Sequence, residues 1–192
     1  MPDGAAGISA FEWVRVLQVG AFFLLLVVCG YTDLAKGKVY DWATYPAIGL
    51  GLGLAYALGG FGWGMGWLNG SSLLNALLGG LIGAAVPGAF ALAGWVGGGD
   101  VKLAAAVGSM MGPWFLILAL LYGSLVGAIF GAAVLLRHHR LREGLKRGLR
   151  MALFLERARE KVGDEKALTV PYGLAMVIGC FAAFFLHIVP GA

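Results

Sequence analysis

Long apolar stretches separated by polar or glycine-rich connections dominate this chain. Six stretches contain few charged residues: 12–31, 42–60, 71–96, 101–111, 114–136 and 170–189. A helix that crosses a membrane needs about 20 apolar residues, because each residue rises about 1.5 Å and the hydrocarbon core is about 30 Å thick. The pattern therefore predicts an all-α, polytopic membrane protein with about six transmembrane helices.

The fourth stretch is too short to cross a membrane unaided. We expect it to be tilted, shielded by neighbouring helices, or extended past the break at Gly112–Pro113. A backbone that stops being helical at membrane depth persists only where protein or water satisfies its polar groups. This segment is therefore marked as unusual.

Glycines also predict close helix packing. The chain has 33 of them, and some pairs are four residues apart, such as Gly79 with Gly83 and Gly49 with Gly53. In lipid, faces of small residues let helices approach closely.

Composition supports a single membrane-embedded domain over residues 1–192. The chain is 60% hydrophobic and only 12% charged, whereas soluble domains have about 25% charged residues. Cys29 and Cys180 are the only cysteines, and both fall in apolar stretches. Without a CxxC motif or a Cys/His cluster, neither a disulfide framework nor a metal site is predicted. The first stretch has acidic residues before and within it and further stretches after it, so we interpret it as retained rather than cleaved.

The connections between the stretches differ in their positive charge. Lys36 and Lys38 lie in the first connection, and Arg and Lys are frequent in the long one at about 137–167, whereas residues 59–70 and Gly112–Pro113 carry no charge. The positive-inside rule then places the first, third and fifth connections in the cytoplasm and both termini outside. The net charge of +4 thus marks orientation rather than a nucleic-acid partner. The long connection is expected to touch anionic lipid, or alternatively to dock a partner.

Three of the ten acidic residues lie where acids are costly. Five acids fall in the basic connection and two near the N-terminus, which leaves Asp33, Asp41 and Asp100 at the cytoplasmic ends of apolar stretches. Acids at membrane depth suggest function by default. Asp33 directly follows the first stretch and Asp100 opens the fourth, on the same side. Two carboxylates in a poorly hydrated site share one proton, so one can activate water while the other hydrogen-bonds a scissile carbonyl.

The residues around these acids have alternative explanations. Gly97, Gly98 and Gly99 allow positive φ and leave room for an extended peptide beside Asp100; the alternative is that Asp100 simply caps a helix. Two further side chains are Lys102, expected to reach lipid phosphate, and Asp41, expected to cap the second helix or to orient substrate. A last group, Pro171, Tyr172 and Gly173, either opens the sixth helix or narrows the site.

Three motifs carry a family resemblance. GGGDVKLAAAVG at 97–108 resembles the signature of the type IV prepilin peptidases, which are GxGD membrane aspartic peptidases. TDLAKGKV at 32–39 is similar to the pattern around that family's other aspartate, and PYGLA at 171–175 to the start of its last helix. The motifs occur in the family's order and are spread over most of the chain.

The resemblance implies a peptidase of the inner (plasma) membrane that cleaves the short basic leader of prepilin or preflagellin-like substrates at the cytoplasmic face. Asp33 and Asp100 would be catalytic, without metal or cofactor, and membrane lipids would be the other partners. The family often has Ile-Pro-Asn where this chain has Val39-Tyr40-Asp41. The paired-cysteine insert of the larger enzymes is missing, which suggests the short branch of tight-adherence (Flp) pilus systems. We therefore expect peptidase activity without methyl transfer.

Two other functions fit the same acids. A non-catalytic transport or pilus-assembly component would use them as a proton relay. A protease that cuts spanning helices within the bilayer normally has its first aspartate inside a helix, whereas Asp33 is expected at a helix end beside Lys36 and Lys38. Replacing either aspartate by asparagine should abolish leader processing if the chain is a prepilin peptidase, and transport if it is a proton-relay component.

Overall fold

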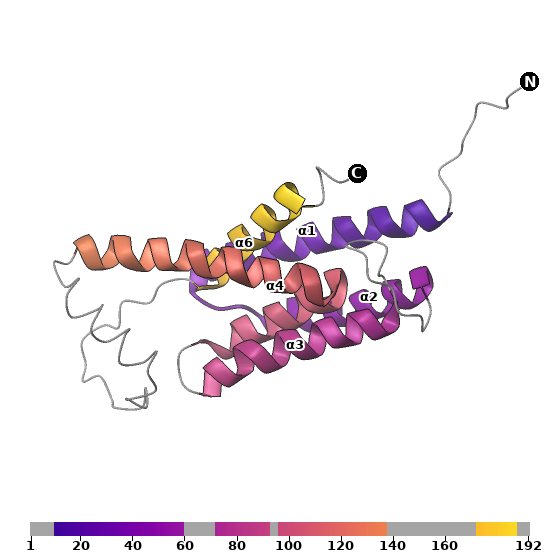
Figure 1. Ribbon diagram of the computed structural model, residues 1–192, viewed down its shortest axis with the longest axis horizontal. Helices are drawn as coiled ribbons and strands as arrows, with labels where there is room; N and C mark the ends of the chain where they lie inside the picture. Colours follow the sequence, from indigo (N-terminus) through magenta and orange to yellow (C-terminus); the bar gives the residue numbers. More distant parts are fainter. Residues whose placement is uncertain (1–9, 60–71, 93–95, 138–171, 188–192) are drawn as a thin grey trace, which may run out of the picture.

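The computed structural model describes residues 10–59, 72–92, 96–137 and 172–187, and these residues form helices and short connections with no strand. Figure 1 shows the five helices that they form. These are α1 (Ala10–Lys36), α2 (Asp41–Gly59), α3 (Leu73–Leu92), α4 (Gly98–Arg137) and α6 (Tyr172–His187). The all-helical prediction is confirmed for the described part of the chain, and α2 begins and ends within one residue of the apolar stretch that predicted it.

The first helix is longer than expected. We predicted that it would end at Tyr31, but α1 continues to Lys36 and includes Asp33 in its last turns. Leu, Ala and Lys favour helix, and a lysine in the last turn suits the negative end of the helix dipole. Gly37 then ends α1 with a φ of 61°, which is the left-handed conformation common just after a helix.

The predicted break at Gly112–Pro113 is present inside α4. Gly112 has φ 83° and ψ 171°, which is not helical. The two parts of α4 fold back on each other, because a residue on each side of the break lies close to the first turn of α6. A β-carbon placed on Gly173 would lie 3.2 Å from Asp100, and one placed on Gly127 would lie 3.7 Å from Ala175. A straight helix would separate positions 100 and 127 by about 40 Å.

A side chain from α1 satisfies a carbonyl at this break. The Gln18 amide nitrogen donates a hydrogen bond to the Met110 carbonyl, and Gln18 is buried among apolar side chains. Interrupted helices need such partners at membrane depth. The bond therefore ties α1 to the point where α4 turns.

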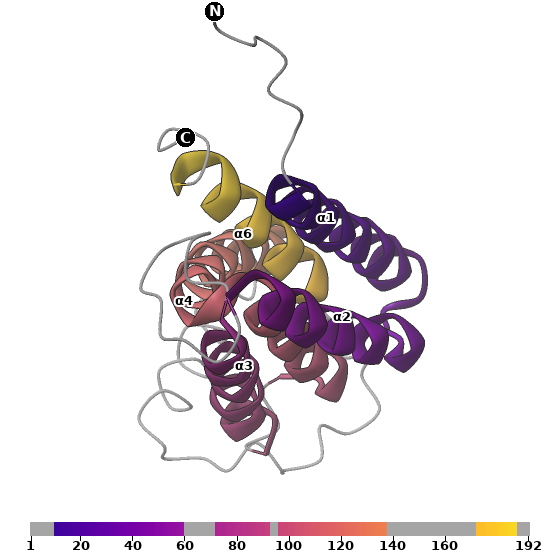
Figure 2. The ribbon, with the colours of Figure 1, turned by 90° about the vertical axis from the view of Figure 1, so that its right-hand side faces the viewer.

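The first part of α4 is the centre of the bundle. Residues 103–111 are all buried, and α4 contacts each of the other four described helices, which surround it in Figure 2. The short fourth stretch is thus shielded by its neighbours, which was one of the three expected solutions. Close approach explains part of the shielding, since β-carbons on Gly79 and Gly83 would overlap the backbone of Gly108 and Ala104.

The other glycine pair has a different environment. Nothing in the described part of the chain lies within 4 Å of a β-carbon placed on Gly49 or Gly53. The expected close approach at this pair is therefore not made by the described helices. Spacing alone predicted both pairs equally, because it does not say which side of a helix meets another.

Three of the described helices are long and apolar enough to cross a membrane, namely Glu12–Lys36, Leu73–Leu92 and Gly98–Ala133, and the shorter Gly173–His187 is also apolar. Large apolar side chains on their outer faces are exposed, including Leu24, Leu81 and Leu121. Such surface is costly in water and favourable in lipid. The chain is therefore a helical membrane protein, while the expected number of about six crossings stays a prediction.

Candidate active site

Asp33 lies in a buried position near the end of α1. Its side chain is only 7% exposed, and its Oδ2 accepts a hydrogen bond of 2.8 Å from the backbone N–H of Leu174. That N–H is one of the first amides of α6, which have no partner within their own helix. The positive end of α6 therefore meets the Asp33 carboxylate.

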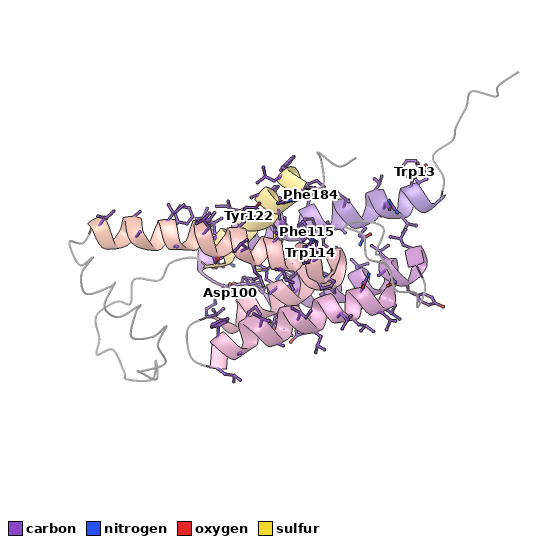
Figure 3. The ribbon with its side chains drawn as sticks, in the orientation of Figure 1. Trp13, Asp100, Trp114, Phe115, Tyr122 and Phe184 are labelled. Carbon is purple, nitrogen blue, oxygen red and sulfur yellow. The ribbon has the colours of Figure 1, made fainter. Side chains whose placement is uncertain are left out.

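Asp100 is the third residue of α4, where a carboxylate is favoured by the helix dipole. Its backbone N–H donates to the Gly97 carbonyl at 3.1 Å. The residue is partly buried. Figure 3 shows Asp100 well away from Trp13, which lies near the start of α1.

The carboxylates of Asp33 and Asp100 both lie next to Gly173. A β-carbon placed on Gly173 would lie 2.9 Å from Asp33 Oδ2 and 3.2 Å from Asp100 Oδ1. The two oxygens cannot be further apart than the sum of these distances, about 6 Å. The first turn of α6, which holds no side chain at this position, thus borders both acids. A water molecule or a peptide carbonyl has the size to contact both oxygens across such a gap.

The three glycines before Asp100 differ in what they touch. A β-carbon on Gly97 would lie 3.2 Å from Asp100 Oδ2, one on Gly98 would meet nothing within 4 Å, and one on Gly99 would lie 3.1 Å from Val39. Glycine allows positive φ, but among the described residues only Gly37 and Gly112 have it. Gly98 and Gly99 are instead the first residues of α4. Of these two, Gly99 allows α4 to pack closely against Val39.

Lys102 and Asp41 form an ion pair beside this site. The Lys102 Nζ lies 2.6 Å from Asp41 Oδ1 and 5.3 Å from the centre of the Tyr45 ring. We expected Lys102 to extend toward lipid phosphate, but a carboxylate and an aromatic face lie within its reach. Asp41 is itself the first residue of α2, so it stands inside the helix rather than before it as a cap. Tyr45 was missed, although its position one turn after Asp41 places both on one face.

The last predicted group is described only in part. Tyr172 begins α6, and Gly173 is the glycine that borders both carboxylates. Pro171 and the side chain of Tyr172 lie outside the described residues. Among the described residues, no three His, Cys, Asp or Glu side chains converge as a metal site would require.

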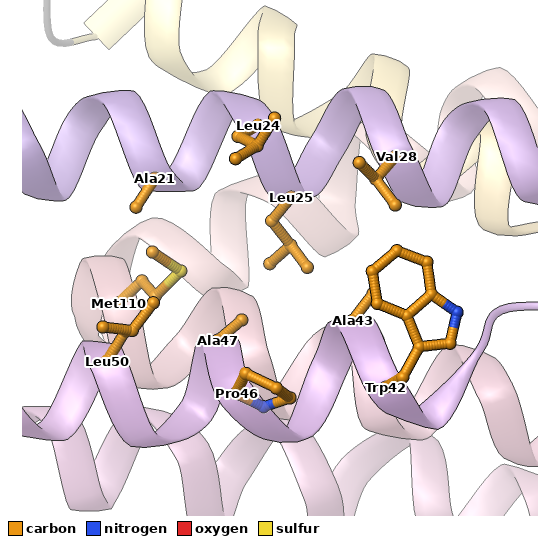
Figure 4. Close-up of a pocket in the computed structure, with 10 residues that line it drawn as sticks. All are labelled: Ala21, Leu24, Leu25, Val28, Trp42, Ala43, Pro46, Ala47, Leu50 and Met110. Atoms are coloured by element: carbon orange, nitrogen blue, oxygen red, sulfur yellow. The ribbon is translucent and has the colours of Figure 1, made fainter.

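An apolar groove of about 180 Å³ runs between α1 and α2, and neither Asp33 nor Asp100 lines it. Figure 4 shows it with Trp42 at one end and Met110 at the other. Charged side chains do not line it; the lining residues are Ala21, Leu24, Leu25, Val28, Trp42, Ala43, Pro46, Ala47, Leu50 and Met110. The groove is suited to hydrocarbon and lacks groups for acid–base chemistry.

Known proteins resemble this chain in sequence. The model of the type IV leader peptidase family matches residues 20–132, which include both aspartates. Two prepilin leader peptidase/N-methyltransferases of Aeromonas salmonicida, one from strain A449, are 38% identical over 119 residues. The match covers 60% of this chain and 39% of each relative, so the chain spans about two fifths of their length. No solved structure matches.

Proposed function

Because this chain belongs to the type IV leader peptidase family, we propose that it is an aspartic endopeptidase that removes the leader of prepilins at the cytoplasmic face of the inner membrane. The observation that carries the proposal is the meeting of Asp33 and Asp100 across Gly173, with their nearest oxygens within about 6 Å. The relatives from Aeromonas salmonicida are named for the same leader cleavage.

The two carboxylates divide the hydrolysis between them. Like charges this close do not both ionise easily, so the pair holds one proton. The ionised carboxylate takes a proton from the attacking water, and the protonated one donates a hydrogen bond to the scissile carbonyl. As the tetrahedral intermediate collapses, the proton gained from water passes to the leaving amine. No further group is needed to balance the reaction.

The bare backbone beside Asp100 is where we place the substrate. Gly97 and Gly98 are exposed, and a β-carbon on Gly98 would meet nothing within 4 Å. An extended peptide can therefore approach the backbone closely here. Gly99 is not part of this surface, because it packs against Val39.

The charge pattern supports the cytoplasmic orientation. Lys36 is in the last turn of α1 and Lys102 in the first turns of α4, at the same end of the bundle as the two aspartates. Basic residues favour the cytoplasmic side of a membrane. With the two parts of α4 counted separately, the described segments would make six crossings, and both termini would lie outside.

Exchange of each aspartate for asparagine tests the proposal. Asn keeps the size of the side chain and can still accept the Leu174 N–H, so Asp33→Asn and Asp100→Asn proteins should insert and fold. General acid–base catalysis contributes about 10²–10⁴-fold to rate, and we expect cleavage of a prepilin to fall by at least that factor. Leader removal is followed by the mobility shift of the pilin on a gel, with thermal unfolding measured on the same preparations.

The matched control is Glu12→Gln, the same chemical change in the first turn of α1, at the far end of the molecule. It should cleave at the wild-type rate. Near-normal processing by Asp100→Asn would show that the two carboxylates do not perform the reaction.

A further inference from the structure

An ion pair ties the Asp100 helix to the start of α2. The Lys102 Nζ lies 2.6 Å from Asp41 Oδ1, and Lys102 follows Asp100 by two residues. On a helix of 3.6 residues per turn, side chains two apart point in nearly opposite directions. Asp100 therefore faces α6, while Lys102 reaches back to α2.

Two more contacts fix the same part of α4. The Lys102 ammonium lies 5.3 Å from the Tyr45 ring centre, within the range of a cation–π interaction. A β-carbon on Gly99 would be 3.1 Å from the Cβ of Val39, so the backbone of α4 lies directly against the connection before α2. The first turns of α4 are thus held against Val39, Asp41 and Tyr45.

These contacts matter because the two acid-bearing helices touch each other little. Contact between α1 and α4 is the sparsest of all the touching helix pairs in the described part of the chain. The distance between Asp33 and Asp100 must then be set by what lies on either side of them. On one side is the start of α6, through Gly173 and Leu174. On the other is the chain that leaves α1 at Gly37 and enters α2 at Asp41.

We propose that Asp41 and Lys102 act together as a clamp that positions Asp100 relative to Asp33. This inference rests on the proposed peptidase function. The two residues are positioning residues, because their bond is to each other. Their side chains are 57% and 34% exposed, and exposed ion pairs contribute little to overall stability. The clamp should therefore influence turnover much more than folding.

A cycle of variants in the full-length protein tests this. We would compare Asp41→Asn, Lys102→Met and the double variant for kcat and KM on a prepilin, and for Tm. Each single change should lower kcat about tenfold, because small displacements of catalytic groups are costly, with KM within about twofold and Tm within a few degrees. The double variant should be no slower than the slower single one, since one pair can be broken only once. Lys102→Arg keeps the pair and should recover most of kcat.

Lys36→Met is the matched control. The Lys36 Nζ also lies 5.3 Å from an aromatic ring, that of Tyr40, yet this contact does not reach α4. Its kcat should equal that of the wild type.

Three results would overturn the clamp. These are wild-type kcat in both single variants, multiplied losses in the double variant, and losses that follow a matching fall in Tm. Asp33→Asn and Asp100→Asn are assayed alongside. If these two still cleave, the peptidase mechanism itself fails. If they do not cleave while the clamp variants turn over normally, only the clamp fails.

Discussion

Gly173→Ala should inactivate the protein without unfolding it. The added methyl group would lie 2.9 Å from both Cγ and Oδ2 of Asp33, and 3.2 Å from Asp100 Oδ1. Favourable contacts between such atoms begin at about 3.5 Å. The Asp33 carboxyl group or the start of α6 would therefore have to move by about 0.5–1 Å.

This movement acts on the two groups that perform the chemistry. It widens the gap between Asp33 and Asp100, and it strains the 2.8 Å hydrogen bond from the Leu174 N–H to Asp33 Oδ2. A misplacement of about 1 Å costs about 10²-fold in rate, which corresponds to about 2.7 kcal/mol of activation free energy. Alanine is up to about 1 kcal/mol better than glycine within a helix. Stability should therefore change little, because this gain offsets part of the steric cost.

The assay is single-turnover cleavage of a prepilin, with Tm measured on the same preparation. Gly53→Ala serves as the control, because it is also a helical glycine and nothing in the described residues lies within 4 Å of its added methyl group. We expect about 10²-fold slower cleavage for Gly173→Ala and no change for Gly53→Ala. Cleavage by Gly173→Ala at the wild-type rate would refute the close placement of the two acids around the first turn of α6.

Three other substitutions separate packing from substrate access. Gly83→Val should lower the free energy of unfolding by about 1–3 kcal/mol or more, measured by thermal unfolding, because its side chain would overlap the Ala104 backbone; an unchanged Tm would contradict this close approach. Gly98→Val, which adds a side chain to an exposed and open position, should raise KM for prepilin. Gly99→Val should instead lower kcat, since it pushes α4 away from Val39. A raised KM for Gly99→Val together with a lowered kcat for Gly98→Val would contradict the placement of the substrate beside Gly98.

The helices could be predicted because apolar runs are long and their limits are marked. Asp41 at one end and Gly59 at the other enclose α2, and the Gly112–Pro113 pair is incompatible with continuous helix. The end of α1 was harder to predict. The fall in hydropathy after Tyr31 suggested a terminus, but the backbone follows helix propensity until Gly37, where a positive φ ends it. Hydropathy indicates where lipid stops, which is not always where a helix stops.

The two acids of the candidate site could be singled out from the sequence, whereas the contacts of their neighbours could not. An acid at membrane depth is costly enough to be identified from the sequence, as Asp33 and Asp100 were. The partner of Lys102 could not be identified in the same way. Its long flexible stem can reach lipid phosphate or a carboxylate, and the choice depends on Asp41, 61 positions away in the chain. The role of Gly173 could not be predicted either. Only when α1, α4 and α6 pack together do the two carboxylates leave no room for a side chain at this position.

Under the proposed function, the position of the two acids near helix ends favours a substrate cut at the membrane surface rather than within the bilayer. Asp33 lies one turn before the end of α1, and Asp100 lies in the first turn of α4. Helix ends leave amide and carbonyl groups without intrahelical partners, and at this depth water can satisfy them. In the proposed orientation, the water that hydrolysis consumes would reach the acids from the membrane surface. A spanning helix would need to unfold and descend to such a site from the bilayer core. Under the proposed function, a leader peptide that joins its apolar segment at the headgroups would lie at the height of Gly97 and Gly98.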